Sequence, residues 1–267
     1  MTGNITLGQF VPGDSAVHRL DPRTKILAMI AYIVLVFLVQ SMAAFAVPFL
    51  FVALALLLSG VPLSYVWSSL KPMRWLIAFM FLINLFFTQG ERVLFSWWIV
   101  RVTAEGVRQA VFISLRLILL VAGTSLLTLT TSPIALTDGL ERLLKPLARI
   151  RFPAHELAMM MTIALRFIPT LLEETDRIRK AQMARGADFE SGGLIARVRA
   201  MVPILVPLFV SAFRRADELA MAMESRCYHG GEGRTRMREL RLARRDLYAA
   251  GTVALFLAAV PVLQIWI

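Results

Sequence analysis

"ILAMIAYIVLVFLVQ", residues Ile26–Gln40, begins a run of forty-five consecutive residues without a charged side chain, which ends at Leu70. A helix crosses a bilayer core of about 30 Å with roughly 20 apolar residues. The run is therefore long enough for two membrane-spanning helices. We expect the first at about Ile26–Gln40 and the second at about Ala43–Leu58, where the sequence "SGVP", Ser59–Pro62, ends it.

The composition of the whole chain agrees with a membrane protein. Its 267 residues are 58% hydrophobic, with a mean hydropathy of +0.68, and only 18% of them are charged. Soluble domains carry roughly 25% charged residues. We therefore expect an all-α membrane protein, since isolated helices satisfy their own backbone hydrogen bonds in lipid.

Three more apolar segments follow the first two. A third span is expected at about Trp75–Thr88, or as a longer, tilted helix that starts near Tyr65–Trp67. A fourth covers about Val107–Thr131 and a fifth Leu247–Ile267. Arg116 lies near the middle of the fourth, and an intramembrane arginine usually faces a protein interior. We interpret it as a packing or partner contact.

Basic residues set the expected orientation. The region 134–245 has 20 Lys or Arg and 13 Asp or Glu, so it carries +7 of the net charge of +11. With five spans, this region and the basic residues beside the first two spans fall on one side, which the positive-inside rule assigns to the cytoplasm. The sequence thus predicts a membrane domain at 1–133, a cytoplasmic module at 134–245, a last span at 246–267 and a cytoplasmic N-terminus. Nucleic acid is not an expected partner, because the basic residues alternate with apolar helix.

The cytoplasmic module should contain about three helices. We place them at Leu136–Leu147, Ala154–Arg185 and Leu194–Arg226, and Gly192 and Gly193 separate the two long ones. The two long helices each have an apolar first half and a charged second half. Such helices suit a position that leads from the membrane surface into the cytoplasm.

The two long helices end in similar tripeptides. Ala184-Arg185-Gly186 ends the first, and Ser225-Arg226-Cys227 follows at an offset of forty-one residues. One interpretation is a helix terminus at which a cation offsets the negative end of the helix dipole. The other is a plug, in which small neighbours let the guanidinium enter a groove on a second protein and pair with a carboxylate. Two copies favour the plug.

A methionine- and proline-containing surface on these helices is a second candidate contact region. Methionine packs into ordinary cores, and its flexible side chain also suits partners that move. The residues are Met159, Met160, Met161, Pro203, Pro207 and Met221.

Catalytic and metal sites find little support. "HELAM" begins at His155 like a zinc-protease helix, but Met159 stands where the second histidine would be needed. The chain has three histidines in all. We expect no catalytic residues, no metal and no cofactor.

Several motifs together resemble one family. They are "HRLDPRTKIL" at His18–Leu27, "MARGAD" at Met183–Asp188, "ESRCY" at Glu224–Tyr228 and "GGEGRTR" at Gly230–Arg236. The chain resembles the transmembrane T component of energy-coupling factor (ECF) transporters over nearly its whole length, and most closely the form shared by several substrate-binding subunits.

The resemblance implies a function without catalysis. In this family the T component docks on two cytoplasmic ABC ATPase subunits through its small-Arg-small motifs, here centred on Arg185 and Arg226. It also holds a membrane-embedded substrate-binding S component, for uptake of vitamins or metal ions across the prokaryotic cell membrane. Cys227 departs from the glycine that is usual at that position. Glycine has no side chain, so its backbone can adopt conformations that strain other residues.

Two other functions fit the sequence less well. A conventional ABC permease subunit would line a translocation path, and it usually carries one short coupling helix with a Glu-Ala-Ala signature, which is not evident here. A membrane enzyme acting on lipid would need clustered acidic or histidine side chains. The acidic residues near the spans are scattered, at Glu91, Glu105 and Asp246.

Overall fold

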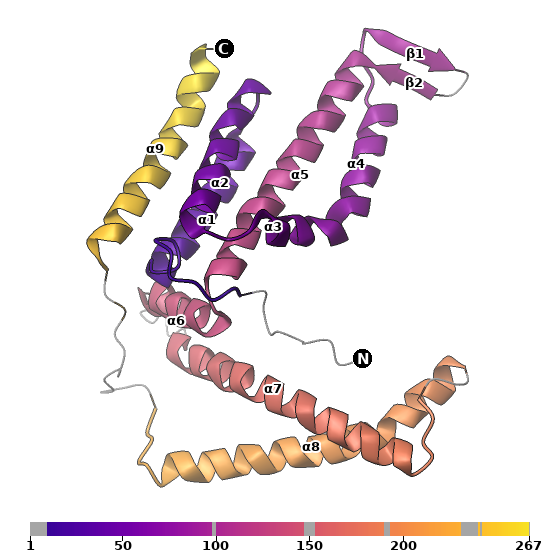
Figure 1. The fold of residues 1–267 in the computed structure, drawn as a ribbon, viewed down its shortest axis with the longest axis vertical. Helices are drawn as coiled ribbons and strands as arrows, with labels where there is room; N and C mark the ends of the chain where they lie inside the picture. Colours follow the sequence, from indigo (N-terminus) through magenta and orange to yellow (C-terminus); the bar gives the residue numbers. More distant parts are fainter. Residues whose placement is uncertain are drawn as a thin grey trace. The chain divides into compact units, whose positions relative to one another are not determined.

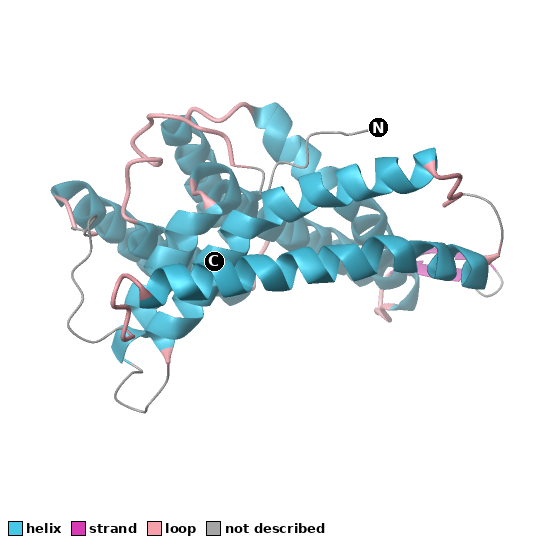
Figure 2. Ribbon diagram, turned by 90° about the horizontal axis from the view of Figure 1, so that it is seen from below, coloured by secondary structure: helices cyan, strands magenta, loops and turns pink. Residues whose placement is uncertain are grey.

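A computed structural model describes residues 10–97, 100–146, 153–189, 193–230, 240 and 242–266. Within these ranges the chain is helical apart from one short β-hairpin, as the cyan helices and magenta strands of Figure 2 show. The expected all-α membrane fold is confirmed. Figure 1 labels the elements that are described below.

The first two predicted spans are helices in the structure. Helix α1 covers Pro22–Leu38, and its start is capped by Asp21, whose side chain accepts a hydrogen bond from the Arg23 amide. After the 3₁₀ turn η1, Ala43–Phe45, helix α2 covers Ala46–Ser59. Gly60 ends it with a φ of 65°, a left-handed conformation that glycine adopts without a steric cost.

The third predicted span is interrupted. Helix α3, Leu63–Leu70, is followed by the 3₁₀ turn η2, Lys71–Met73, and by helix α4, Arg74–Phe87. Pro72 lies in the turn, where it cannot donate a helical hydrogen bond, and Figure 1 shows α3 lying across the direction of α4. The helical segment therefore starts near Tyr65–Trp67, the earlier of the two expected starts, but it changes direction at η2 instead of forming one long tilted helix.

A β-hairpin, which was not predicted from the sequence, precedes the fourth span. Strand β1, Val93–Trp97, pairs antiparallel with strand β2, Val100–Thr103. The Thr103 hydroxyl then accepts a hydrogen bond from the Gly106 amide at 3.0 Å and caps helix α5, Ala104–Thr130. Helices α4 and α5 run side by side below this hairpin in Figure 1.

Helices α1 and α5 provide much of the core, together with α2 and α9, the C-terminal helix Arg244–Trp266. Tyr32 is buried and its hydroxyl donates to the Leu119 carbonyl at 2.7 Å. Gly123 lies directly against the Tyr32 ring, where a Cβ would clash. The other fully buried apolar side chains of this cluster include Leu35, Val36, Val39, Leu129 and Val260.

Arg116 makes the packing contact expected of an arginine inside a span. Its Nη2 donates at 2.7 Å to the carbonyl of Val39, the C-cap residue that follows α1. Its guanidinium also lies 4.8 Å from the centre of the Phe112 ring and 5.7 Å from that of Phe37. These contacts offset the cost of a cation within apolar surroundings.

A polar cluster joins the start of α1 to the start of α9. The carboxylate of Asp246 accepts hydrogen bonds from the amides of Asp21 and Ala243, both at 2.8 Å. Arg23 donates to the Asp21 carboxylate at 3.0 Å. Burial alone would raise the pKa of Asp21, but the hydrogen bonds from Arg23 outweigh it and lower that pKa below its ordinary value.

Lys25, one of the basic residues beside the first span, is enclosed by the protein. It is buried, and its Nζ donates to the carbonyls of Thr130 and His18 and to the hydroxyl of Thr131 at distances of 2.9 to 3.1 Å. The end of α5 therefore supplies the oxygens that replace water around this ammonium group.

The remaining helices agree closely with the predicted module. They are α6, Pro133–Leu144; α7, Ala154–Ala184; and α8, Leu194–Glu224. The chain divides into two compact units, residues 1–143 with 239–267 and residues 144–238. The predicted boundaries at 133 and 245 concern the membrane surface and stay predictions.

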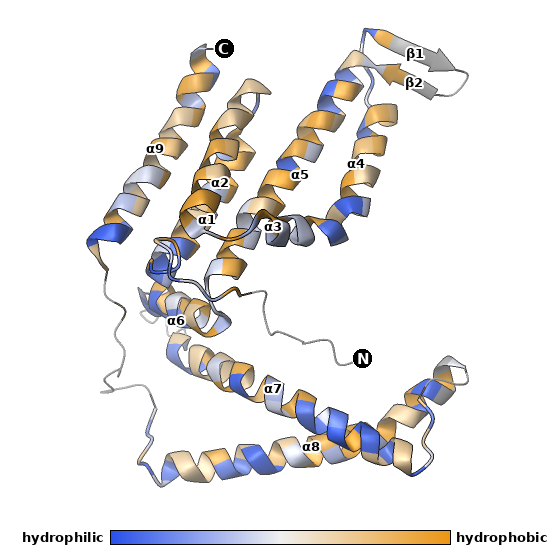
Figure 3. Cartoon of the chain, in the orientation of Figure 1, coloured by the Kyte–Doolittle hydropathy of each residue, from blue (hydrophilic) through white to orange (hydrophobic). Residues whose placement is uncertain are grey.

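In the part of the chain that the structure describes, four helical runs are long and apolar enough to cross a membrane. They are Leu63–Phe87, Ala104–Thr130, Ala154–Ala184 and Arg244–Trp266. Figure 3 shows that α7 differs from the other three, because hydrophilic residues dominate its second half. Helix α1 has 17 residues, and the total of about five spans stays a prediction.

Candidate functional site

Helices α7 and α8 form an antiparallel crossing. Arg215 Nη2 donates to Glu174 Oε2 at 2.7 Å, and Gln182 Nε2 donates to the Pro203 carbonyl at 3.3 Å. Since the partner's number on α8 falls as the number on α7 rises, the two helices run in opposite directions. Their two C-terminal ends therefore lie at opposite ends of the pair.

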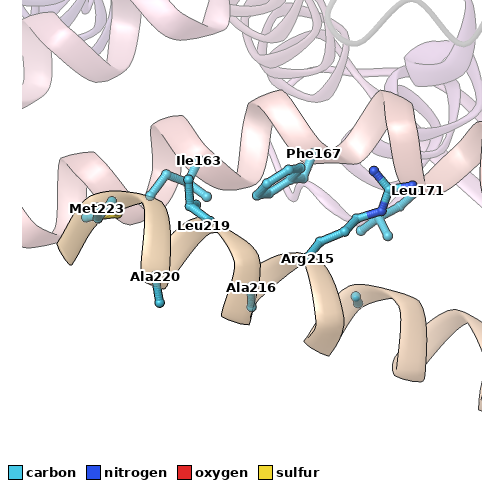
Figure 4. Close-up of a pocket in the computed structure, with 9 residues that line it drawn as sticks. Ile163, Phe167, Leu171, Arg215, Ala216, Leu219, Ala220 and Met223 are labelled. Carbon is cyan, nitrogen blue, oxygen red and sulfur yellow. The ribbon is translucent and has the colours of Figure 1, made fainter. Parts of the chain in front are cut away.

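A shallow apolar groove of about 260 Å³ lies along this crossing. Figure 4 shows Ile163, Phe167 and Leu171 of α7 facing the side chains of α8. The α8 side of the groove consists of Ala212, Arg215, Ala216, Leu219, Ala220 and Met223. The small residues of α8 keep the two helices close while the groove stays open to the outside.

The first arginine tripeptide ends α7 with a complete pattern of backbone hydrogen bonds. The Gly186 amide donates to the Met183 carbonyl and the Ala187 amide to the Gln182 carbonyl, both at 3.0 Å. Gly186 has a φ of 85°. These bonds and the left-handed residue define a Schellman motif, in which Arg185 is the C-cap.

The second tripeptide repeats this geometry at the end of α8. The Cys227 amide donates to the Glu224 carbonyl at 2.9 Å and the Tyr228 amide to the Met223 carbonyl at 3.0 Å. Cys227 has a φ of 57°, which is unusual for a residue with a side chain. The cysteine therefore adopts the glycine-like conformation that the sequence left open, and Arg226 occupies the position that Arg185 occupies on α7.

Both tips are exposed. Every residue of the two tripeptides, Ala184, Arg185, Gly186, Ser225, Arg226 and Cys227, is exposed. Neither guanidinium forms an ion pair with a carboxylate of the described residues. Both arginine side chains are thus accessible from outside the chain.

The crossing ion pair joins equivalent positions of the two helices. Glu174 and Arg215 are separated by forty-one residues, as are Arg185 and Arg226, so each arginine follows the ion pair by eleven residues. At 1.5 Å per residue, each arm is about 16 Å long. The pair of helices therefore has an approximate twofold axis through this ion pair, with one arginine at the end of each equal arm.

The predicted methionine and proline surface is largely exposed. Met160, Met161 and Met221 have exposed fractions of 54%, 48% and 62%, whereas Met159 is half-buried. Pro203 and Pro207 lie within α8 and are also exposed. The structure does not gather these residues into one site.

Gln182 was not recognised from the sequence. Pro207 has no N–H, so the carbonyl of Pro203 lacks its usual helical donor, and the Gln182 amide supplies one. Glu174 and Arg215 were also missed, although the offset of forty-one residues that relates the arginines relates them as well. That repeat was the signal that could have found them.

No set of three His, Cys, Asp or Glu side chains in the described residues is arranged to hold a metal ion. Most of the "GGEGRTR" motif, residues 231–236, lies outside the described residues.

Comparison with known proteins identifies the family. Residues 13–237 match the model of CbiQ, described as cobalt transport protein. The chain belongs to the CbiQ family. It is 59% identical to the energy-coupling factor transporter transmembrane protein EcfT of Thermosediminibacter oceani, over 92% of each chain. It is 56% identical to EcfT of Clostridium kluyveri over 100% of this chain and 99% of that one, and 51% identical to EcfT of Bacillus subtilis over 90% and 91%.

This membership makes the chain the transmembrane T subunit of an ECF transporter, as its motifs suggested. The family is a component of transport complexes. The relatives come from bacteria, which agrees with a bacterial membrane protein.

Proposed function

We propose that the chain transmits ATP-driven motion from two cytoplasmic ABC ATPase subunits to a membrane-embedded S component that binds a vitamin or a metal ion. The observation that carries this proposal is the pair of exposed arginines at the ends of two equal arms. Two related ATPase subunits would offer two related sockets, which such a twofold arrangement fits.

Each ATPase subunit would bind one helix end. The small residues beside Arg185 and Arg226 let a guanidinium enter a narrow groove and pair with a carboxylate there. The Schellman bonds already occupy the last carbonyls of the helices, so that each end is rigid before it docks. Removing one partner of such a buried charge pair costs roughly 2–5 kcal/mol.

The exposed apolar side of α8 would contact the S component or lipid. Val202, Val206, Phe209 and Phe213 recur at spacings of three or four residues, and their exposed fractions are 49% to 69%. A helix with this much exposed apolar surface usually has a partner. Met160, Met161 and Met221, elsewhere on α7 and α8, would add exposed side chains that repack as the S component moves.

The proposed orientation places the N-terminus and residues 134–245 in the cytoplasm. Basic residues beside the first spans and in this region support it through the positive-inside rule. No observation favours a conventional permease subunit, since the chain's family is that of the ECF T component.

Charge reversal at the two arginines tests the proposal. The transporter would be purified with Arg185→Glu, Arg226→Glu or both, and the co-purifying ATPase subunits and S component would be quantified. We expect each single variant to weaken ATPase binding roughly 30-fold or more, from the 2–5 kcal/mol above, and the double variant to abolish it. Arg179→Glu and Arg214→Glu are matched controls, because both arginines are exposed on the same helices but lie away from the tips. Undiminished ATPase binding and transport in the double variant would refute the proposal.

A further inference from the structure

A second cavity, of about 370 Å³, lies in the first compact unit among α1, α2, α5 and α9. Its wall is mostly apolar, with Met29, Phe51, Leu54, Leu126, Val253 and Phe256 among the residues that line it. Its volume is within the range of small-molecule sites, which are typically about 300–1,000 Å³. Tyr248 and Leu54, at its edge, are 73% and 38% exposed, so the cavity opens toward the surface of the unit.

Apart from Thr252 on α9, the polar residues of the cavity gather at one end. Thr24 and Lys25 lie near the start of α1, and Arg245 and Tyr248 lie near the start of α9. The two helix starts are adjacent, because the Asp21 amide donates to Asp246. The opposite end of the cavity is apolar and reaches Phe256.

The depth of the cavity matches one leaflet of a membrane. Arg245 and Phe256 are eleven residues apart on α9, which is about 16 Å along a helix. Half of a hydrocarbon core of about 30 Å is about 15 Å. A chain that starts beside Arg245 and ends beside Phe256 would therefore span one leaflet.

The polar end of the cavity is positively charged. Lys25 is buried and donates to three uncharged oxygen atoms, so no carboxylate contacts its Nζ. Arg245 is exposed and forms no ion pair with a carboxylate of the described residues. The nearby Asp246 carboxylate accepts hydrogen bonds from two backbone amides, and its charge acts on Lys25 and offsets one of the two cations, so this end of the cavity keeps a net positive charge. Two cations beside a hydroxyl-bearing rim favour an anionic group such as phosphate.

We propose that this cavity binds one anionic phospholipid, with its phosphate at Arg245, Tyr248 and Thr24 and one acyl chain along α9 toward Phe256. The site is distinct from the arginine tips and does not require the coupling function. The proposed orientation of the chain would place this lipid in the cytoplasmic leaflet, and only that placement depends on the proposed function.

The test uses the complete transporter in nanodiscs of phosphatidylcholine with phosphatidylglycerol as the minor component. Lipid that remains bound after detergent extraction would be identified and counted by native mass spectrometry. We expect one phosphatidylglycerol per T subunit. Ala249→Phe, which fills the cavity, should remove it, and Arg245→Gln should lower the preference for phosphatidylglycerol about fivefold, as expected for one basic residue near a membrane surface.

Two neighbouring residues give matched controls. Ala250→Phe and Arg244→Gln change exposed residues of the same turn that do not line the cavity, and they should retain the lipid. Arg245→Gln changes an exposed side chain, so its result does not depend on tolerance of a larger core residue. Equal retention in all four variants, equal binding of phosphatidylcholine, or no stoichiometric lipid in the unmodified transporter would overturn the proposal. Because Arg185→Glu should keep the lipid, failure of this proposal and failure of the coupling function are distinguishable.

Discussion

Exchanging the charges of Glu174 and Arg215 tests whether the crossing of α7 and α8 holds the two arginine tips in place. Either single reversal, Glu174→Arg or Arg215→Glu, puts two like charges at the crossing. The double reversal restores an ion pair of opposite polarity at the same point. If this ion pair holds the arginine tips in place, the single variants should weaken binding of the ATPase subunits and the double variant should restore it.

The size of the effect follows from the exposure of the pair. Two unit charges about 4 Å apart attract by about 4 kcal/mol at an effective dielectric constant of 20. Fully exposed pairs retain only about 0.2–1 kcal/mol after screening and side-chain ordering. Arg215 and Glu174 are 36% and 28% exposed, so we expect a coupling energy of about 1 kcal/mol. That energy is about a fivefold change in the dissociation constant.

A double-mutant cycle on ATPase binding measures this coupling energy. The four forms of the transporter would be reconstituted in nanodiscs and titrated with the purified ATPase subunits. Arg214→Glu is the control, because Arg214 and Glu218 form a pair of 3.8 Å within α8 that is far more exposed and does not join the helices. A double variant that binds no better than the singles would show that the ion pair does not position the tips.

Three further outcomes are expected. Gly186→Ala should destabilise the end of α7 by about 1 kcal/mol, because its φ is 85°, whereas Gly251→Ala, inside α9 with open space around it and no positive φ, should not; hydrogen exchange of the amides that follow each residue measures the difference. Gln182→Met should remove the donor to the Pro203 carbonyl and cost about 0.5 kcal/mol in thermal unfolding of the transporter, because this bond is exposed and water can replace it, while Lys180→Met, on an exposed neighbour, should be neutral. Since hydrogen bonds lower the pKa of folded Asp21, its stabilising effect is present above its ordinary pKa of 3.8 and is lost as the pH falls through the folded value. Unfolding of Asp21→Asn should therefore depend less on pH below about 4 than that of the unmodified protein.

The helices were predictable because their signals are local. Long apolar runs, with the "SGVP" sequence that ends the second of them, placed α1, α2 and α5 within a few residues of their observed bounds. Ala154 and Leu194 were predicted as the first residues of α7 and α8, and the structure begins both helices there. The turn at Pro72 was harder, because a proline at the start of a helix and a proline that breaks one look alike in sequence.

The contacts that organise the site depend on tertiary structure. No local pattern indicates that Lys25 is buried, because the oxygen atoms that accept its hydrogen bonds come from His18, Thr130 and Thr131, two of which lie over a hundred residues away. The bond from Gln182 to Pro203 requires two helices to cross at one register, which no local pattern specifies. The arginine tips were found because their sequence repeats, whereas the ion pair between them combines unlike residues and was overlooked.

Stabilisation of the helix ends does not by itself account for the arrangement of the arginines. A cation at a helix C-terminus contributes about 0.3–1 kcal/mol through the helix dipole, and either Arg185 or Arg226 could have this role alone. That energy depends only on the last turn of its own helix, so it places no condition on the distance to the crossing. Yet both arginines follow the Glu174–Arg215 pair by the same eleven residues. The residue after each arginine has the same left-handed conformation, even though Cys227 must adopt it at a steric cost. Equal arms matter only if both ends meet surfaces that are themselves related by symmetry, which is what a pair of ATPase subunits would provide.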